Sequence, residues 1–248
     1  LFKLRREIYE KTLQYNFSHI FFIDSFDFTK FYLQKYKIKN ILYCQVIGPS
    51  VFLWNKNKAK YINKNLSKIF SIFEIEKKFY SKNVYSHIGY PLLEKLKLKK
   101  KKSNLIKNIG IFLGSRDQEI SNNIDEIKKL VNILTNNHDC KIKFFTTLQS
   151  NKKIKNIFKN KDINFILNND KYYNELSKLD FAFACSGTVH LELFYSNIPH
   201  IIFYKTNYFN FLFVKIFIKI KYVSIMNIFN DKEIVKEFIQ YNFKSNHM

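Results

Sequence analysis

The sequence predicts an α/β protein built on parallel β-sheets. Short runs of apolar and aromatic residues alternate along the 248 residues with polar stretches of helical length. Runs that are apolar throughout are typical of parallel strands that are buried on both faces. A lysine-rich stretch, LLEKLKLKKKKSNLIK, follows the third run and predicts a linker or a solvated turn between two domains, with a patch for nucleic acid or lipid headgroups as the alternative. We therefore expect domains over residues 1–104 and 105–248.

Eight segments have the length and composition of strands. Three precede the lysine-rich stretch, at residues 19–24, 40–46 and 69–74. Five follow it, at residues 108–114, 141–147, 163–167, 180–186 and 200–205. The second half therefore predicts a complete doubly wound domain, and the first half predicts the later part of another. Because the chain opens on Leu1 in a charged helical stretch, we expect an N-terminal truncation.

The stretch at residues 207–229 is rich in Phe, Ile and Tyr, with Lys215 and Lys219 on one helical face. This pattern predicts an amphipathic helix, which lies either at a membrane surface or in the packing between domains. Lys or Asn interrupts the long apolar segments before they reach the ~20 residues that a spanning helix needs. We therefore do not expect an integral membrane protein.

Lys and Arg outnumber Asp and Glu by 42 to 20, which gives a formal net charge of +22. Such an excess favours nucleic acid or an anionic membrane as a partner. The chain is also rich in Asn, Ile, Phe and Tyr, whose codons are rich in A and T, so genomic bias is an alternative explanation. Cys44, Cys140 and Cys185 are far apart and match no metal motif. They indicate a reducing cytoplasm and no metal site.

Two strand ends in the second half carry small polar loops that lead into helices. At the first, Gly114, Ser115 and Arg116 follow the strand, and apolar residues at helical spacing come after them. A helix N-terminus offers unpaired N–H groups to an anion, and glycine allows the anion to approach the backbone closely. Arginine adds a two-pronged donor suited to a phosphate. This loop is a candidate phosphate site.

At the second strand end, Ser186, Gly187 and Thr188 open a helix, and Glu192 lies on the same face one turn later. The loop suits phosphate oxygens, and the carboxylate could accept hydrogen bonds from the vicinal hydroxyls of a ribose. In the alternative, the hydroxyl side chains cap the helix and Glu192 is a solvated first-turn acid. Two phosphate-suited loops in one domain favour a nucleotide site, although the chain has neither a Walker lysine pattern nor GxGxxG.

Asp24 and Asp27 are candidate catalytic groups in the first half, where the first strand ends. A strand-end aspartate in a cleft could take a proton from a hydroxyl nucleophile, which suits Asp24. Asp27 fits a helix cap better. Metal binding by the two aspartates has weak support, because the sequence shows no third ligand near them. His190 and His200 adjoin the second loop, and we expect both to be structural.

Six segments, in order and spacing, resemble those of bacterial lipid-A-disaccharide synthases. IFLGSRDQEI, ACSGTVHLELFYSNIPHIIFYK and KYVSIMNIF resemble the LPGSR-x-x-E, SGT-x-x-x-E-x-x-x-x-x-x-P and YVSLPN segments of that family. In the first half, FFIDSFDF, YCQVIGPSVFLW and SIFEIEKKFY resemble IDAPDF, YVSPSVWAW and PFE-x-x-FY. The resemblance covers nearly the whole chain.

The resemblance implies a GT-B fold, with two Rossmann-like domains facing across a cleft and the N-terminal one incomplete. It implies an inverting transfer that needs no metal or cofactor. UDP-2,3-diacylglucosamine would donate its sugar to 2,3-diacylglucosamine 1-phosphate, forming the β-1,6 disaccharide and UDP. The resemblance makes Asp24 the general base or an orienting acid. It assigns the UDP site to Gly114, Ser115, Arg116, Glu119, Ser186, Gly187, Thr188, Glu192 and Asn227.

The resemblance also implies a cytoplasmic protein, peripheral to the inner face of the cytoplasmic membrane, without a nucleic-acid partner; it leaves a homodimer open. Two rival hypotheses are an inactive remnant that binds UDP or anionic lipid, and another UDP-sugar glycosyltransferase of the same fold. The chain departs from the family at Phe26, Leu113 and Met226, which replace prolines, and at Tyr90, which replaces a histidine. The family's first strands have no counterpart in this sequence.

Overall fold

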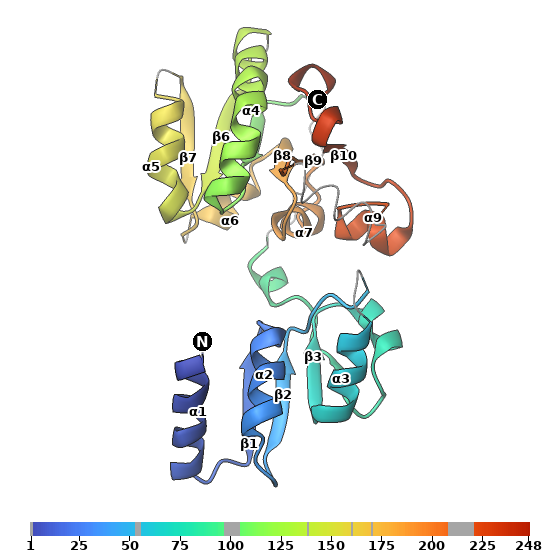
Figure 1. Cartoon of the computed structure of the whole chain (residues 1–248). Helices are drawn as coiled ribbons and strands as arrows, with labels where there is room; N and C mark the ends of the chain where they lie inside the picture. The colour runs from blue at the N-terminus through green and yellow to red at the C-terminus, as the bar shows by residue number, and fades with distance from the viewer. Residues whose placement is uncertain are drawn as a thin grey trace. The chain divides into compact units, whose positions relative to one another are not determined.

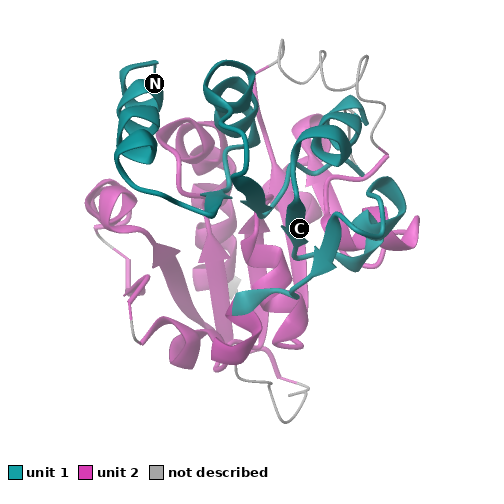
Figure 2. Cartoon of the chain, turned by 90° about the horizontal axis from the view of Figure 1, so that it is seen from below, with its two compact units in different colours: residues 1–91 teal, residues 92–248 magenta. Residues whose placement is uncertain are grey.

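The computed structural model describes residues 2–52, 56–96, 105–137, 139–159, 161–169, 171–207 and 221–248. Contacts within the chain divide it into two compact units, residues 1–91 and 92–248, which Figure 2 shows in different colours. Each unit is built on one parallel sheet (Figure 1), which confirms the predicted α/β class. The domain division predicted near residue 104 falls among residues outside the described ranges and stays a prediction.

Unit 1 holds four parallel strands in the order β1-β2-β3-β4, so each strand pairs with the next one in the chain. Right-handed crossovers that advance in one direction place their helices on one face of a sheet. The elements are α1 (Phe2–Gln14), β1 (His19–Ile23), α2 (Phe26–Tyr36), β2 (Leu42–Val46), α3 (Asn57–Asn65), β3 (Lys68–Ser71), η1 (Glu74–Phe79) and β4 (Tyr85–His87).

Burial in unit 1 agrees with one covered face. Phe22, Tyr43 and Ile69, from three neighbouring strands, are buried in one cluster with side chains of α2 and α3. Phe21 and Ile23 alternate with Phe22 along β1, and they are 53% and 73% exposed. The described helices α2 and α3 of unit 1 therefore pack on one face of its sheet.

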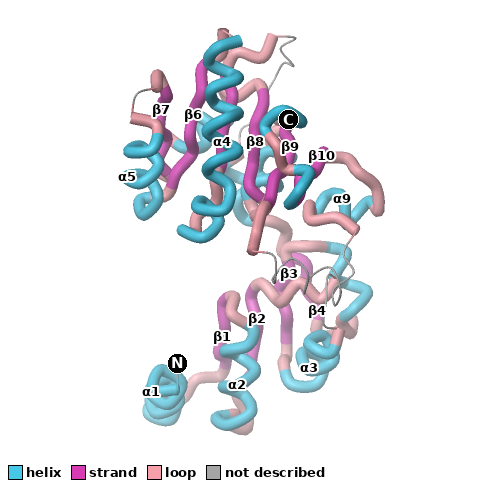
Figure 3. Tube along the Cα trace, turned by 45° about the horizontal axis from the view of Figure 1, so that its top comes forward, coloured by secondary structure: helices cyan, strands magenta, loops and turns pink. Residues whose placement is uncertain are grey.

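Unit 2 holds six parallel strands with helices between them (Figure 3). The short helix η2 (Pro91–Lys95) begins at the boundary between the two units. The elements of unit 2 up to its fourth strand are β5 (Asn108–Phe112), α4 (Asp117–Asn137), β6 (Lys141–Thr146), α5 (Leu148–Ile157), β7 (Ile163–Leu167), α6 (Tyr172–Leu176) and β8 (Phe181–Cys185). The remaining elements are α7 (Val189–Tyr195), β9 (His200–Tyr204), α9 (Ile225–Asn230), β10 (Lys236–Ile239), η4 (Gln240–Asn242) and η5 (Ser245–His247).

The strands of unit 2 lie in the order β10-β9-β8-β5-β6-β7. Read from β7 and numbered from the first strand of the unit, this is 3-2-1-4-5-6, the order of a doubly wound Rossmann sheet. From β5 the chain winds outward to β6 and β7, and it then returns to β8 on the other side of β5. Winding therefore reverses between β5 and β8, where ligands of such sheets bind outside the carboxyl ends of the strands.

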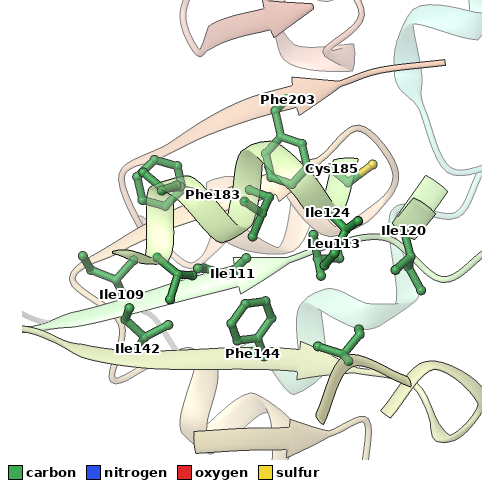
Figure 4. Packing of buried hydrophobic residues seen from close by; sticks show 14 of the residues in the cluster. Ile109, Ile111, Leu113, Ile120, Ile124, Ile142, Phe144, Phe183, Cys185 and Phe203 are labelled. Atoms are coloured by element: carbon green, nitrogen blue, oxygen red, sulfur yellow. The ribbon is translucent and has the colours of Figure 1, made fainter. Parts of the chain in front are cut away.

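Both faces of the unit 2 sheet are buried. Ile109 and Ile111 of β5 lie on the side of α4, in a cluster with Ile120 (Figure 4). Phe112, the next residue of the strand, belongs to a second cluster with Leu176 of α6. Because neighbouring residues of one strand face different helices, the strand is apolar throughout, as its sequence predicts.

Each of the eight predicted strand segments overlaps a strand, although the segment 69–74 runs past the end of β3 to the start of η1. The structure adds β4 and β10, which pair in parallel with β3 and β9 at the edges of the two sheets. The predicted amphipathic helix falls mainly on residues 208–220, outside the described ranges, and its last residues overlap α9. No helix within the described ranges has the length and apolarity that a membrane span requires.

Candidate functional site

A cavity of about 360 Å³ lies at the carboxyl ends of the strands of unit 2. Both loops selected from the sequence contribute to it, although they are far apart in the chain. It occupies the place beside β5 and β8 where the winding of the sheet reverses. Its lining consists of Phe112, Gly114, Ser115, Arg116, Glu119, Phe145, Thr146, Thr147, Asn168, Tyr172, Cys185, Ser186, Gly187, Thr188 and Val189.

The loop after β5 is held by a carboxylate of its own helix. Ser115 N and Arg116 N donate to Glu119 Oε2 at 3.1 and 3.3 Å, and Arg116 Nη1 donates to Glu119 Oε1 at 2.8 Å. A glutamate in the first helical turn that reaches back to the N-cap amide is half of a capping box. Gly114 has φ +94°, which glycine adopts without strain. Glu119, in the first turn of α4, thus ties Ser115 and Arg116 of the loop to the helix.

The loop after β8 presents polar groups to the cavity. Ser186 N donates to Phe203 O at 3.0 Å and so continues the strand pairing by one residue. Gly187 and Thr188 are exposed, and the Thr188 side chain makes no cap hydrogen bond although this residue is the N-cap of α7. Helix capping therefore does not account for Thr188, whose side chain lines the cavity instead.

A third side of the cavity comes from the strand ends of β6 and β7, which the sequence reasoning missed. Phe112 and Phe145 stack with their ring centroids 4.5 Å apart, and Tyr172 meets Phe145 edge-on at 5.3 Å. The two threonines that end KIKFFTT were the available signal in the sequence. Polar groups beside these rings belong to Thr146, Thr147 and Asn168.

The family model for Lipid-A-disaccharide synthetase matches residues 1–248. The chain belongs to this family. Lipid-A-disaccharide synthase of Rickettsia bellii (strain OSU 85-389) is 28% identical over 214 residues, and the match covers 81% of this chain and 56% of that protein. Lipid-A-disaccharide synthase of Aquifex aeolicus (strain VF5) is 29% identical over 215 residues, with 84% and 58% covered. The chain thus spans just over half the length of these curated relatives.

Solved structures resemble the chain at much lower identity. The crystal structure of TarM is 12% identical, with a TM-score of 0.46, over 91% of this chain and 45% of that one. The fold of unit 2 is therefore assigned from its strand order and not from these likenesses. The GT-B arrangement, with two domains facing across a cleft, stays an expectation from the family.

In this member of the lipid-A-disaccharide synthetase family, Glu192 is buried in α7 and does not line the cavity. Burial raises its pKa, and a hydrogen bond with Tyr172 offsets part of that rise. Its Oε2 has no hydrogen-bond partner among the residues that the structure describes. The alternative of a solvated acid is wrong. Glu192 is linked to the cavity by its hydrogen bond with Tyr172, which lines it. The contact of Glu192 with a ribose stays a prediction.

Asn227 requires a correction. Its Nδ2 donates to Val235 O and Glu237 Oε1, both at 2.7 Å, and its Oδ1 accepts from Ile234 N at 2.7 Å and Val235 N at 2.9 Å. These four bonds use the full capacity of an amide side chain. The side chain therefore has no free hydrogen-bonding group for the predicted contact with the sugar donor. Asn227 instead fixes the connection between α9 and β10.

Asp24 lies in unit 1, in a turn with two consecutive left-handed residues. Asp24 and Ser25 have φ values of 56° and 43°. The side chain of buried Gln45 donates to Asp24 O at 2.8 Å and accepts from Thr29 Oγ1 at 2.8 Å. Such backbone conformations cost about 1–3 kcal/mol each outside glycine and cluster at functional sites. The turn presents Asp24, which is exposed, from a fixed backbone.

The other candidates have structural contacts. Asp27 pairs with Lys58, whose Nζ lies 2.9 Å from Oδ1. Burial lowers the pKa of His190 to about 4, and it also lowers the pKa of His200, so both imidazoles are neutral at neutral pH. Burial raises the pKa of Cys185 to about 12. Although Cys185 lines the cavity, its thiol stays protonated and is a poor nucleophile.

Proposed function

We propose that this chain binds UDP in the cavity beside β5 and β8 and acts as a lipid-A-disaccharide synthase. The observation that carries the proposal is the meeting of two phosphate-suited loops at the strand pair where winding reverses. Family membership supplies the class of reaction, since the curated relatives are lipid-A-disaccharide synthases. Neither loop alone would identify a nucleotide site.

In this proposal the loops after β5 and β8 hold the diphosphate. The Arg116 side chain is 81% exposed and can pair with phosphate oxygens. Ser186 and Thr188 add hydroxyl donors from the opposite loop. Donors that are fixed before the reaction stabilise the negative charge that develops on UDP as the sugar leaves. The uracil would lie at the other end of the cavity, beside the aromatic rings and the polar groups of Thr146, Thr147 and Asn168.

Asp24 is the proposed general base. It would take the proton of the 6-hydroxyl of 2,3-diacylglucosamine 1-phosphate as that oxygen attacks the anomeric carbon of the donor. The bond from this carbon to the UDP oxygen breaks on the opposite face, so the new linkage is β. An exposed carboxylate on a rigid turn suits this role, because its position does not depend on a mobile loop.

The inner face of the cytoplasmic membrane is the proposed working surface. Both proposed substrates carry acyl chains, and the acceptor carries a phosphate. The excess of basic residues, 42 Lys and Arg against 20 Asp and Glu, favours contact with an anionic leaflet. The protein would thus be peripheral and cytoplasmic.

Mass spectrometry of the reaction products tests the proposal. The purified chain is mixed with UDP-2,3-diacylglucosamine and 2,3-diacylglucosamine 1-phosphate, and we expect the disaccharide 1-phosphate and UDP. Asp24→Asn should slow the reaction by about 100-fold or more. Asp27→Asn, the same change three residues later in the first turn of α2, should stay within a few-fold of the parent. Absence of product while UDP still binds would contradict the synthase activity, and full turnover by Asp24→Asn would contradict the base.

A further inference from the structure

The carboxylate of Glu119 occupies the groups that the proposed site offers to a phosphate. Its Oε2 accepts from the amides of Ser115 and Arg116, and its Oε1 accepts from the Arg116 guanidinium. Amides at the start of a helix, together with an arginine, are the donors that commonly bind a phosphate oxygen. The acid of the loop itself is therefore bound where a ligand anion would bind.

The loop is shaped around this carboxylate. A Cβ atom at Gly114 would lie 2.5 Å from Glu119 Oε2, so a larger residue there would collide with the acid. The Glu119 side chain is 15% exposed, whereas that of Arg116 is 81% exposed. The acid is thus the anchored partner of the ion pair. The positive end of α4, a helix of 21 residues, further favours a negative charge at this point.

We propose that Glu119 is a built-in counter-anion, which holds the loop in the free chain and gives way to the diphosphate of a nucleotide. This inference rests on the proposed function, because it takes the loop to be a phosphate site. A single carboxylate charge now faces the donors. A diphosphate brings more negative charge and more acceptor oxygens, so it competes for the same donors better than a singly charged anion does. The exchange therefore selects diphosphates over small monoanions.

Isothermal titration of the intact chain with inorganic pyrophosphate and with UDP tests the exchange. Glu119→Gln removes the competing charge, and we expect it to bind both ligands about ten-fold more tightly than the parent. Asp125→Asn is the matched control, because Asp125 is exposed on the same helix and does not line the cavity. It should stay within about two-fold of the parent, since water and salt screen a distant surface charge. Unchanged or weaker binding by Glu119→Gln would overturn the proposal.

Two further results separate this inference from the proposed function. Tighter pyrophosphate binding by Glu119→Gln, with no UDP binding by either protein, would support the exchange and refute the nucleotide site. Absence of pyrophosphate binding by both proteins would overturn the exchange. If circular dichroism shows that Glu119→Gln is unfolded, Glu119→Ala takes its place, because it also removes the competing carboxylate. It should also bind pyrophosphate more tightly than the parent, and weaker binding would count against the exchange.

Discussion

Glu76, in η1, is a carboxyl group whose burial makes the stability of unit 1 depend on pH. It is 3% exposed and accepts a hydrogen bond from Ser71 Oγ. Burial raises its pKa from 4.5 to about 7, and the hydrogen bond offsets only part of that rise. The folded state therefore holds this proton more tightly than the unfolded state does. The resulting stability is fully present below pH 4.5 and is lost as the pH rises through 7.

Glu76→Gln should remove this loss, because the amide stays neutral at every pH. Relative to the parent, the variant's free energy of unfolding should rise by about 3 kcal/mol as the pH increases from 4.5 to 7, and this difference should persist above pH 7. Urea unfolding followed by circular dichroism measures this. Exposed Glu74 supplies the control variant, Glu74→Gln, which should track the parent. A gain that does not vary with pH would contradict a raised pKa.

Site residues could be predicted where the sequence itself marks them as loop residues. Gly114 and Ser186 follow apolar runs, and the structure places both at the cavity. The roles of Glu192 and Asn227 could not be read in this way. The sequence alone does not show whether a carboxylate or an amide contacts a ligand or other residues of its own chain. For Glu192 this depends on how α7 packs, and for Asn227 it depends on the turn before β10.

The turn between β1 and α2 depends on the neighbouring strand. Gln45, buried in β2, donates to the carbonyls of Asp24, Val46 and Ile47, at distances from 2.8 to 3.3 Å. It also accepts from Thr29 Oγ1 in α2. A single side chain thus satisfies the backbone where two parallel strands end, and it fixes the left-handed residues of the turn.

Gln45→Ala should destabilise unit 1 by about 2–3 kcal/mol, because buried polar groups lose their partner. It should also reduce disaccharide formation more than UDP binding, since the turn carries the proposed base and the cavity lies in unit 2. Urea unfolding followed by circular dichroism, turnover and titration measure the three quantities. Gln34→Ala, exposed on α2, should change none of them. Equal losses of turnover and UDP affinity would refute a specific effect on the turn.

Strands could be predicted from sequence where they lie in continuous apolar runs, and eight of them were. Tyr85–His87 and Lys236–Ile239 escaped because neither is a continuous apolar run. Each is a strand because it pairs with an edge, β3 in one unit and β9 in the other. Pairing between segments far apart in the chain leaves no local pattern, so the strand order could not be predicted either.

The strand order of unit 2 brings the two polar loops, which are separate in the sequence, to one site. The chain returns from β7 to pair β8 with β5, and this step brings the two polar loops to the same cavity. A different order would leave the same sequences apart on the sheet. The family match covers all 248 residues, and these span just over half the length of the curated relatives. UDP binding by this chain therefore has to be measured on the chain itself.

Titration of UDP into the parent chain, Arg116→Gln and Arg6→Gln is the most direct measurement of whether this cavity is the nucleotide site. Arg116 lines the cavity, whereas Arg6 is an exposed residue of α1 that pairs with Glu10. Loss of a charge-assisted hydrogen bond to phosphate should weaken UDP binding by Arg116→Gln by about ten- to a hundred-fold. Arg6→Gln, which removes the same charge, should bind UDP as the parent does. Equal UDP affinity in Arg116→Gln and the parent would place the nucleotide elsewhere and contradict the proposed site.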